Sequence, residues 1–354
     1  MKPQLSHWAA ASFEAARRLT GPGVDERSRR QHGHSFRVEL RTSLEPGWGG
    51  LAGAESQVLQ QHLQEVVAAL DYQDLNTLMN DPADDQILRW ISQRLALPAV
   101  QRLHLWAGPA CGATLDGKGR LHGWLRDRFE SAHRLPNVSA GHKCGRMHGH
   151  GFEVILWVRG LSPNFTKAWG LLRQRLHLAC LNDIEGLENP TSEMLSSWIW
   201  RYLITAVPAL SAVTVFETAS CGAVFDGQRY HIWKDRSFDS ATRLHAAPAG
   251  DPRGRLHGHT YVLRLGLSGP LDRVMGWTVD FGDVKSLFSP VFRQLDHYPL
   301  HETLPSGDNA AIAHWIHKAA APLLPALDRI ALFDTPATGT VLAWGAAATS
   351  SVAV

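Results

Sequence analysis

Apolar and polar positions alternate with the two-residue period of a β-strand in the middle of the chain. Within 148–158, every second residue from Phe152 to Val158 is apolar. This alternation predicts a strand with one face on a core. A second strand is expected just before it, over 127–135, leading into a loop rich in Gly, Pro and polar residues. The two segments together indicate a strand pair.

Helical patterns follow this strand pair. They cover 167–181 and, near the C-terminal end, 283–295. A second helix in each of three regions is marked by a tryptophan, expected to face a sheet: Trp90, Trp198 and Trp315. Apolar strand pairs with turns close the regions, around 103–106 with Asp116-Gly117, 213–216 with Asp226-Gly227, and 330–333 with Gly339. The predicted order is ββααββ.

This pattern is repeated three times. The triplet His-Gly-His begins at His32, His148 and His257, with offsets of 116 and 109 residues. A Phe-acid-small-Ala motif keeps the same two offsets, and a tryptophan stands five residues before each copy: Trp8, Trp124 and Trp233. We therefore divide the chain into a first unit (1–121), a middle unit (122–232) and a third unit (233–354).

A single unit of four strands and two helices would leave the edges of its sheet unpaired. Joining three such units edge to edge into a closed barrel removes these edges. The sequence thus predicts an α+β protein. Its three tandem units would form an intramolecular, pseudo-trimeric antiparallel β-barrel with the helices outside.

Composition narrows the class of protein. The chain has 354 residues and a net charge of +2, so its charge does not indicate a nucleic-acid or membrane partner. It has no apolar run typical of a signal peptide or a membrane span, and its four cysteines show no disulfide framework. We expect reduced thiols and a cytoplasmic location. Cys111, Cys180 and Cys221 are expected in the core, Cys180 on a helix, and the tail 346–354 to be disordered.

The middle unit contains a candidate metal site. Residues two apart on a strand share a face, so His148 and His150 project together. His133 on the neighbouring strand can complete a set of three imidazoles. Such a set leaves a fourth position open, which is typical of catalytic zinc. The alternative is a turn whose histidines lie on the surface.

The outer units lack this set. Arg17 and Thr242 stand where His133 would be, and Ser28 and Arg253 stand at the position of Cys144. Two histidines with Arg or Thr make a poor zinc site. We expect one zinc ion per chain.

Longer motifs in the middle unit resemble a known family. Phe-Glu-Ser-Ala-His-Arg-Leu-Pro at 129–136 and Gly-His-Lys-Cys-Gly-Arg-Met-His-Gly-His at 141–150 resemble the 6-carboxytetrahydropterin synthases, relatives of the 6-pyruvoyltetrahydropterin synthases with the tunnelling fold. Further agreement comes from Leu-Glu-Asn-Pro-Thr-Ser-Glu at 187–193, Val-Asp-Phe-Gly-Asp-Val-Lys at 279–285 and Gln-Leu-Asp-His at 294–297.

The resemblance implies a role for each matching residue. His133, His148 and His150 would hold zinc, and Cys144 would be the general base, as a thiolate favoured by Lys143 and Arg146. In the family, an Asp-His pair from a neighbouring subunit forms a proton relay, and only Asp296 and His297 match both of its residues. A glutamate of the family binds the pterin, and only Glu217 matches it; Thr191 or Ser192 would assist. Candidates for triphosphate binding are Arg134, Lys143 and Arg17. Pooled across the units, these residues make one complete composite site.

The implied reaction converts 7,8-dihydroneopterin triphosphate to 6-carboxy-5,6,7,8-tetrahydropterin, acetaldehyde and triphosphate, a step toward queuosine and other 7-deazapurines. Two alternatives stay open. One is a related lyase that forms a pyruvoyl or hydroxymethyl pterin. The other is a pterin- or purine-binding scaffold without catalysis. The sequence also leaves open whether two barrels stack as a homodimer.

Overall fold

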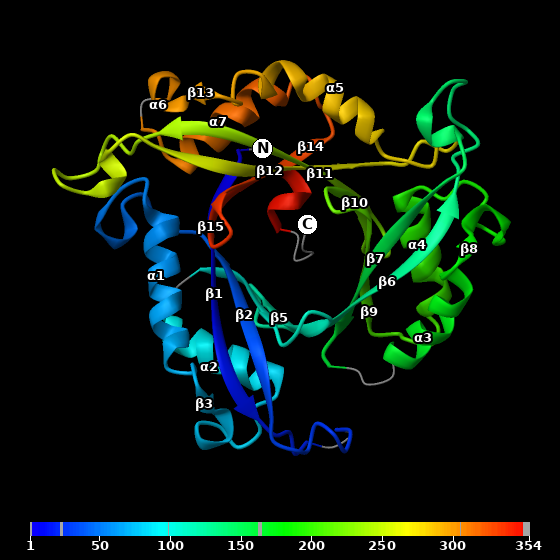
Figure 1. Cartoon of the computed structure of the whole chain (residues 1–354), viewed down its shortest axis with the longest axis horizontal. Coiled ribbons are helices and arrows are strands. Elements are labelled where there is room, and N and C mark those ends of the chain that lie inside the picture. Colours follow the sequence, from blue (N-terminus) through cyan, green and yellow to red (C-terminus); the bar gives the residue numbers. More distant parts are fainter. Residues whose placement is uncertain (1, 22–23, 98, 162–164, 305, 350–354) are drawn as a thin grey trace.

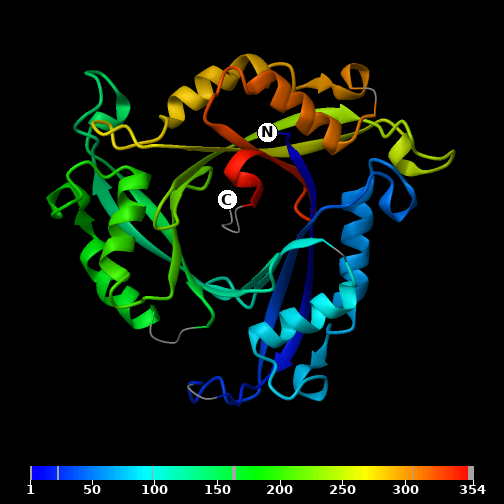
Figure 2. The same ribbon diagram turned by 180° about the vertical axis from the view of Figure 1, so that it is seen from behind.

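The computed structural model describes residues 2–349, apart from 22–23, 98, 162–164 and 305. Within these residues, twelve strands form a closed antiparallel barrel with the helices on its outer side (Figure 1). The barrel closes where β10 pairs with β11. Seen from behind, the three units occupy three sectors around one axis (Figure 2). The predicted fold class and pseudo-trimeric barrel are confirmed.

Each unit contributes two long and two shorter barrel strands. The first unit contains β1 (Gln4–Arg17), β2 (His32–Thr42), α1 (Glu55–Ala68), β3 (Gln73–Asp74), α2 (Asp84–Leu95), β4 (Val100–Trp106) and β5 (Cys111–Asp116). The middle unit contains β6 (Leu121–His133), β7 (His148–Arg159), α3 (Phe165–Leu176), β8 (Ala179–Cys180), α4 (Ser192–Leu203), β9 (Leu210–Thr218) and β10 (Cys221–Phe225). The third unit contains β11 (Tyr230–Thr242), β12 (His257–Gly269), α5 (Phe281–Phe292), β13 (Tyr298–Pro299), α6 (Leu300–Thr303), α7 (Asn309–Ala320), β14 (Leu327–Thr335) and β15 (Thr338–Ala343).

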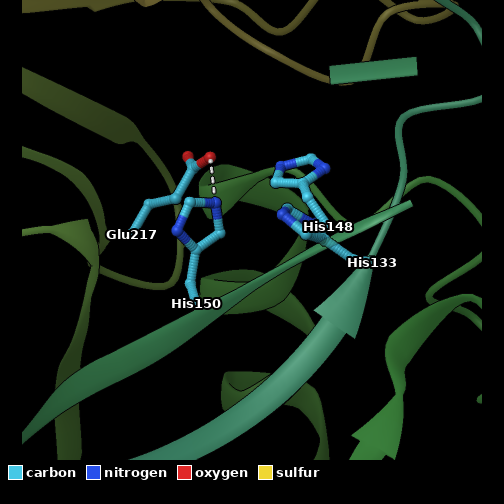
Figure 3. Close-up of side chains that lie close together, drawn as sticks. All are labelled: His133, His148, His150 and Glu217. Carbon is cyan, nitrogen blue, oxygen red and sulfur yellow. Dashed lines mark ion pairs between the residues drawn. The ribbon is translucent and has the colours of Figure 1, made fainter. Parts of the chain in front are cut away.

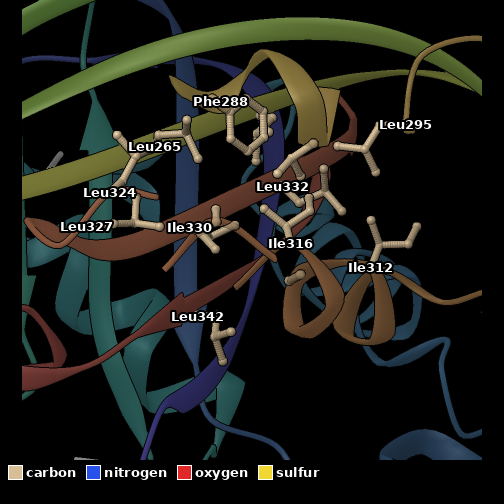
Figure 4. Packing of buried hydrophobic residues seen from close by; sticks show 14 of the residues in the cluster. Leu265, Phe288, Leu295, Ile312, Ile316, Leu324, Leu327, Ile330, Leu332 and Leu342 are labelled. Atoms are coloured by element: carbon tan, nitrogen blue, oxygen red, sulfur yellow. The ribbon is translucent and has the colours of Figure 1, made fainter. Parts of the chain in front are cut away.

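Hydrophobic cores lie between each unit's strands and its own helices. In the third unit, Phe288 of α5 and Ile312 and Ile316 of α7 pack on Leu265 and Leu332 of the barrel wall (Figure 4). The other two units have equivalent clusters. Alternate residues of every strand therefore face this outer core, and the remaining ones face the barrel interior.

The Asp-Gly turns connect the units. We predicted Asp116-Gly117 and Asp226-Gly227 as turns within each closing strand pair, and this is wrong. Asp116 ends β5 and Asp226 directly follows β10, so each turn leads into the next unit. As a result, β5 pairs with β6 and β10 with β11 across the boundaries. Gly339 is likewise inside β15 rather than in a turn. The fused chain therefore joins its units through strand hairpins.

A tryptophan and a glycine lie together at these junctions. Trp124 of β6 is directly opposite Gly112 of β5, and Trp233 of β11 is opposite Gly222 of β10. Trp8 of β1 faces Gly339 in the same way. A Cβ on Gly112 would overlap the Leu105 carbonyl oxygen and lie 2.7 Å from the Trp124 ring. Trp124 and Trp233 thus pack where only glycine leaves room for their rings, whereas a Cβ on Gly339 would overlap Phe333.

Three smaller expectations are corrected. Cys180 lies in the short strand β8 rather than on a helix, because α3 ends at Leu176. Cys111 is exposed, whereas its counterpart Cys221 is buried. The tail is ordered as far as a 3₁₀ turn, η6 (Gly345–Thr349); residues 350–354 lie outside the described part of the chain. Among the described helices, none has the length and apolarity to span a membrane.

The junction predicts the effect of one substitution. Gly112→Ala should lower the free energy of unfolding by about 1–3 kcal/mol, because the added methyl group overpacks the contact with Leu105 and Trp124. Gly108→Ala, in the same hairpin with nothing within 4 Å of the new Cβ, is the matched control and should change it by less than about 0.5 kcal/mol. Urea unfolding measures both. Equal effects of the two variants would rule out this packing role.

Candidate metal centre

Two neighbouring strands of the middle unit bring three histidines together. His133 ends β6 and pairs with His148 of β7, while Ser131 pairs with His150. The three imidazole centroids lie 4.5–5.2 Å apart. Glu217 of β9 joins them, and one ligand atom from each of the four side chains lies within 4.8 Å of the others (Figure 3). This group has the composition and spacing of a metal site.

Backbone carbonyls orient two of the imidazoles. Nδ1 of His133 lies 3.0 Å from the Pro190 carbonyl oxygen, and Nδ1 of His148 lies 2.8 Å from that of Arg146. A carbonyl only accepts, so both Nδ1 atoms carry the hydrogen and both Nε2 atoms keep a free lone pair. Nε2 of His133 and Nε2 of His150 are buried without a hydrogen-bond partner. A metal ion would satisfy these atoms.

Burial favours the neutral form of two of the imidazoles, those of His133 and His150. Burial lowers the pKa of His133 to about 4, although the nearby Glu217 carboxylate acts in the opposite direction. Burial also lowers the pKa of His150. Neutral imidazole is the form that ligates a metal, so the residues present fit a divalent ion.

Glu217 has one carboxylate oxygen at the cluster and the other at helix α4. Oε1 lies 3.5 Å from Nε2 of His150, and Oε2 accepts a hydrogen bond of 2.7 Å from the Ser192 hydroxyl. The sequence placed Ser192 beside Glu217, and the structure brings them together. Glu217 can therefore act as a metal ligand or bind another partner, but one oxygen cannot do both at once.

Cys144 lies in a 3₁₀ turn, η3 (Lys143–Gly145), between the two histidine strands. Its backbone N–H donates to Nδ1 of His142 at 3.2 Å. Burial, and then the Glu217 carboxylate, raise the pKa of the Cys144 thiol, while Lys143 lowers it. Lys143 therefore favours the thiolate as expected, whereas burial and the Glu217 carboxylate favour the thiol. A bound cation would act in the opposite direction.

The third unit covers this centre with the segment that precedes α5. Nδ2 of Asn189 donates to the Met275 carbonyl oxygen at 2.7 Å, and the Thr191 hydroxyl donates to the Gly276 carbonyl oxygen. Nε2 of His142 lies 3.7 Å from the carboxylate of Asp280. The centre is therefore composite: the middle unit provides the histidines and the third unit provides one wall.

A buried carboxyl group also stabilises this contact between the middle and third units. Glu193 of α4 is 2% exposed, and its Oε1 accepts a hydrogen bond of 2.8 Å from the backbone N–H of Thr278. Burial raises the pKa of Glu193 to about 8, and the nearby carboxylates of Glu217 and Asp280 also raise it. Near neutral pH, this side chain is therefore largely protonated.

Asp296 and His297 lie elsewhere in the chain. His297 donates its backbone N–H to Asp239, and its Nδ1 lies 3.1 Å from Oδ1 of Asp296. The pair precedes β13, and His297 lines a hollow that is also lined by His259 of the third unit's own His-Gly-His triplet. In Figure 1, β13 and the middle unit's β8 occupy different sectors of the barrel. Within one chain, the described structure therefore does not bring this relay to the middle histidines.

The candidate phosphate-binding residues differ in accessibility. Arg134 and Lys143 are exposed near the centre. Arg17 is buried in the first unit, where it forms an ion pair of 2.7 Å with Asp84 and donates to the Pro82 carbonyl oxygen. Arg17 is thus occupied and does not serve the middle unit's site.

The outer units have no equivalent centre among the residues described. In the first unit, the guanidinium of Arg17 occupies the position of an imidazole. In the third unit, the hydroxyl of Thr242 donates to the Gly307 carbonyl oxygen, and the carboxylate of Asp334 accepts from Gln57 and Thr338. Both positions are filled by hydrogen bonds that need no metal.

The sequence did not predict the unpaired polar atoms where segment 274–280 of the third unit contacts the middle unit. Oδ1 of Asn189 and Oγ1 of Thr278 are buried without a hydrogen-bond partner, beside the composite contact. Asn189 and Asp280 stand in motifs already noted, but nothing in the sequence alone showed that segment 274–280 lies against the middle unit. These free polar atoms can bind a ligand.

Comparison with known proteins defines the class. The family model described as 6-pyruvoyl tetrahydropterin synthase matches the chain three times, over 7–118, 123–228 and 231–343. The chain therefore belongs to this family, as three fused copies.

Individual relatives match one unit each. A 6-carboxy-5,6,7,8-tetrahydropterin synthase from Synechocystis sp. is 35% identical over 117 residues, covering 28% of this chain and 89% of the relative. A dihydroneopterin monophosphate aldolase from Pyrococcus furiosus is 32% identical over 111 residues, covering 30% of this chain and 92% of the relative. Among solved structures, the 6-pyruvoyl tetrahydropterin synthase of Caenorhabditis elegans shares 22% identity over 31% of this chain and 92% of its own, with a TM-score of 0.28.

Glu193 predicts a pH-dependent stability. Its folded pKa of about 8 lies above the ordinary value of 4.5, so between these values the folded chain keeps a proton that the unfolded chain releases. This contribution to the free energy of unfolding is present below pH 4.5 and is lost as pH rises, by about 1.4 kcal/mol per pH unit. Glu193→Gln keeps the acceptor for Thr278 but does not titrate.

The variant should therefore gain stability relative to wild type between about pH 5 and pH 8. Urea unfolding at both pH values measures this difference. Glu185→Gln, an exposed neighbour, is the control and should show a constant difference. A constant difference for Glu193→Gln as well would mean that Glu193 is not a protonated, buried group.

Proposed function

We propose that this protein is a zinc-dependent pterin side-chain lyase. The proposed reaction converts 7,8-dihydroneopterin triphosphate and water to 6-carboxy-5,6,7,8-tetrahydropterin, acetaldehyde and triphosphate, as part of 7-deazapurine synthesis in the cytoplasm. The observation that carries the proposal is the composite centre, in which His133, His148, His150 and Glu217 meet beside the Cys144 turn. The family membership supports a pterin substrate.

His133, His148 and His150 would hold the zinc ion, one per chain. When bound, zinc supplies Lewis-acid chemistry that makes coordinated hydroxyl groups of a substrate side chain more acidic. Cys144 would accept a proton from the substrate side chain as the general base. Its thiol must first lose a proton, which the positive charge of Lys143 favours and the carboxylate of Glu217 opposes.

Glu217 would bind the pterin ring through the ring's adjacent N–H donors. The hydrogen bond from Ser192 fixes one carboxylate oxygen, so the other can turn from His150 toward the pterin. Thr191 supports this arrangement indirectly, because its hydroxyl donates a hydrogen bond to Gly276 of the third unit. The exposed side chains of Arg134 and Lys143 would bind the triphosphate.

A second molecule would supply the Asp-His relay. The positions of His297, Leu178 and Tyr72 are equivalent in the three units, and these side chains are 78%, 81% and 84% exposed. Each backbone is in the left-handed region. Two large hydrophobic residues exposed at equivalent positions indicate a surface that contacts another molecule. We propose that two barrels stack there as a homodimer, with Asp296 and His297 of one chain reaching the centre of the other.

One related activity is a second candidate. The Pyrococcus furiosus relative is an aldolase acting on dihydroneopterin monophosphate. The same centre could support release of a shorter side chain and leave a hydroxymethyl pterin. The spacing of three residues between Cys144 and His148 favours the carboxy product instead.

Product analysis tests the proposed reaction. Zinc-loaded protein is incubated with 7,8-dihydroneopterin triphosphate and the products are identified by mass. We expect 6-carboxytetrahydropterin and acetaldehyde, and a loss of at least about a hundredfold in rate for Cys144→Ala because the base is missing. Cys111→Ala, in the first unit, is the matched control and should stay active. A hydroxymethyl or pyruvoyl product would move the protein to a related lyase, and unchanged substrate would refute the proposal.

Mixing two inactive variants tests the proposed relay. Cys144→Ala and His297→Ala chains are co-expressed with different tags, and the mixed dimer is isolated. In that dimer, one of the two centres has both Cys144 and His297, so the isolated mixed dimer should show about half of wild-type activity. Full activity of His297→Ala alone, or no recovery in the mixed dimer, would show that the relay does not act between chains.

A further inference from the structure

The interior of the barrel contains a cavity of about 770 Å³. Inward-facing side chains from strands of all three units line it. This volume is within the range of small-molecule binding sites in proteins. The cavity is distinct from the metal centre, whose three histidines are not among its lining residues.

The three walls of this cavity differ chemically. At one level of the barrel, the first unit places Arg41 opposite Arg102. The register-equivalent pairs are Trp157 opposite Ala212 in the middle unit and Gly266 opposite Arg329 in the third. A trimer of identical chains would repeat one pair three times. The fused chain instead has a basic wall facing an aromatic one.

The basic wall has guanidinium groups without a carboxylate partner. Other arginines near the interior form ion pairs, as Arg264 does with Asp235 at 2.7 Å and Arg126 with Glu153 at 2.6 Å. Among the described residues, neither Arg41 nor Arg102 forms such a pair, although Nη2 of Arg102 lies 3.2 Å from Nδ1 of His104 and Glu39 lines the same cavity. The Nε atoms of both are buried and have no hydrogen-bond partner.

Leaving these charges unpaired destabilises the free protein. Burial lowers the pKa of Arg41 to about 9, and the positive charges of Arg329 and Arg102 lower it further. Burial likewise lowers the pKa of Arg102 to about 10, although the Glu39 carboxylate acts in the opposite direction. Two buried like charges side by side are unfavourable unless an anion compensates them. The structure therefore carries a local cost that a bound anion would relieve.

Tryptophan rings make up much of the aromatic wall. Trp124 and Trp233 line the cavity and are 2% and 1% exposed, yet neither indole N–H has an acceptor. Trp157 and Ile155 extend the apolar surface beside them. The guanidinium carbon of Arg102 lies 5.4 Å from the Trp157 ring centroid, so the two walls meet within the cavity.

We propose that the barrel interior is a binding site for a planar aromatic anion, with its ring against Trp157 and Ile155 and its anionic group at Arg41 and Arg102. The guanidinium groups of the basic wall favour a ligand whose polar group accepts hydrogen bonds. The apolar surface disfavours a small inorganic anion, which would leave it in contact with water. Arginine suits this role because its planar group binds oxyanions in a bidentate manner and stacks on aromatic rings.

The test uses 2-naphthalenesulfonate as the probe on the full-length, zinc-loaded protein. Isothermal titration calorimetry measures affinity and stoichiometry, and tryptophan fluorescence reports the site. We expect one probe per chain. Methyl 2-naphthyl sulfone, the uncharged analogue, and inorganic sulfate should each bind at least about tenfold more weakly. Equal binding of the sulfone would show a merely hydrophobic cavity, and equal binding of sulfate would show an adventitious ion only; either result overturns the proposal.

Variants locate the probe. Arg41→Met and Arg102→Met should each weaken probe binding at least about tenfold. Arg159→Met, an exposed arginine on the same barrel, is the matched control and should bind normally. The two interior variants should also melt at or above the wild-type temperature without probe, because an uncompensated buried charge is removed. Normal probe affinity in folded Arg41→Met and Arg102→Met proteins would overturn the proposal. If either variant does not fold, Arg41→Lys must show weaker binding, because it lacks the planar group.

Discussion

The pairing of every sheet edge with a neighbouring unit is the constraint on which the rest of the structure depends. A four-stranded unit has two unpaired edges, and both are satisfied only when three units close a barrel. At each junction a tryptophan packs where the opposite strand has glycine, as Trp124 does over Gly112. This contact recurs in all three units. The complete set of metal ligands does not recur, because Arg17 and Thr242 stand at the position of His133 in the outer units.

Because the three copies are fused in one chain, their sequences can differ while the barrel stays closed. Each copy can then carry different chemistry at the same place in the fold. Arg17 and Thr242 replace His133 with groups that satisfy local hydrogen bonds, and the middle unit alone keeps the imidazole cluster. The same freedom produces the unequal walls of the barrel interior. Segment 274–280 of the third unit nevertheless stays essential to the middle centre, because it forms one wall and contacts Glu193 and Asn189.

Much of this organisation could be predicted from the sequence, because it is periodic. The strand alternation, the repeat offsets and the edge argument led to the pseudo-trimeric barrel, and the i, i+2 spacing of His148 and His150 led to the metal cluster. Other features depend on contacts between distant residues. The placement of Asp296 and His297 follows from the pairing of β13 with β11, and the wall at Asp280 follows from packing between units. The Asp-Gly motifs also led to a wrong prediction, because an Asp116-Gly117 turn has the same sequence whether it joins two strands of one unit or connects two units.

The central claim is that three homologous units provide one metal centre per chain. X-ray anomalous diffraction at the zinc edge, on crystals grown with zinc, tests it most directly. The account predicts a single strong anomalous peak per chain, enclosed by His133, His148 and His150. Peaks of similar strength at the His-Gly-His triplets of the outer units, at His32 and His257, or no peak among the middle histidines, would contradict it.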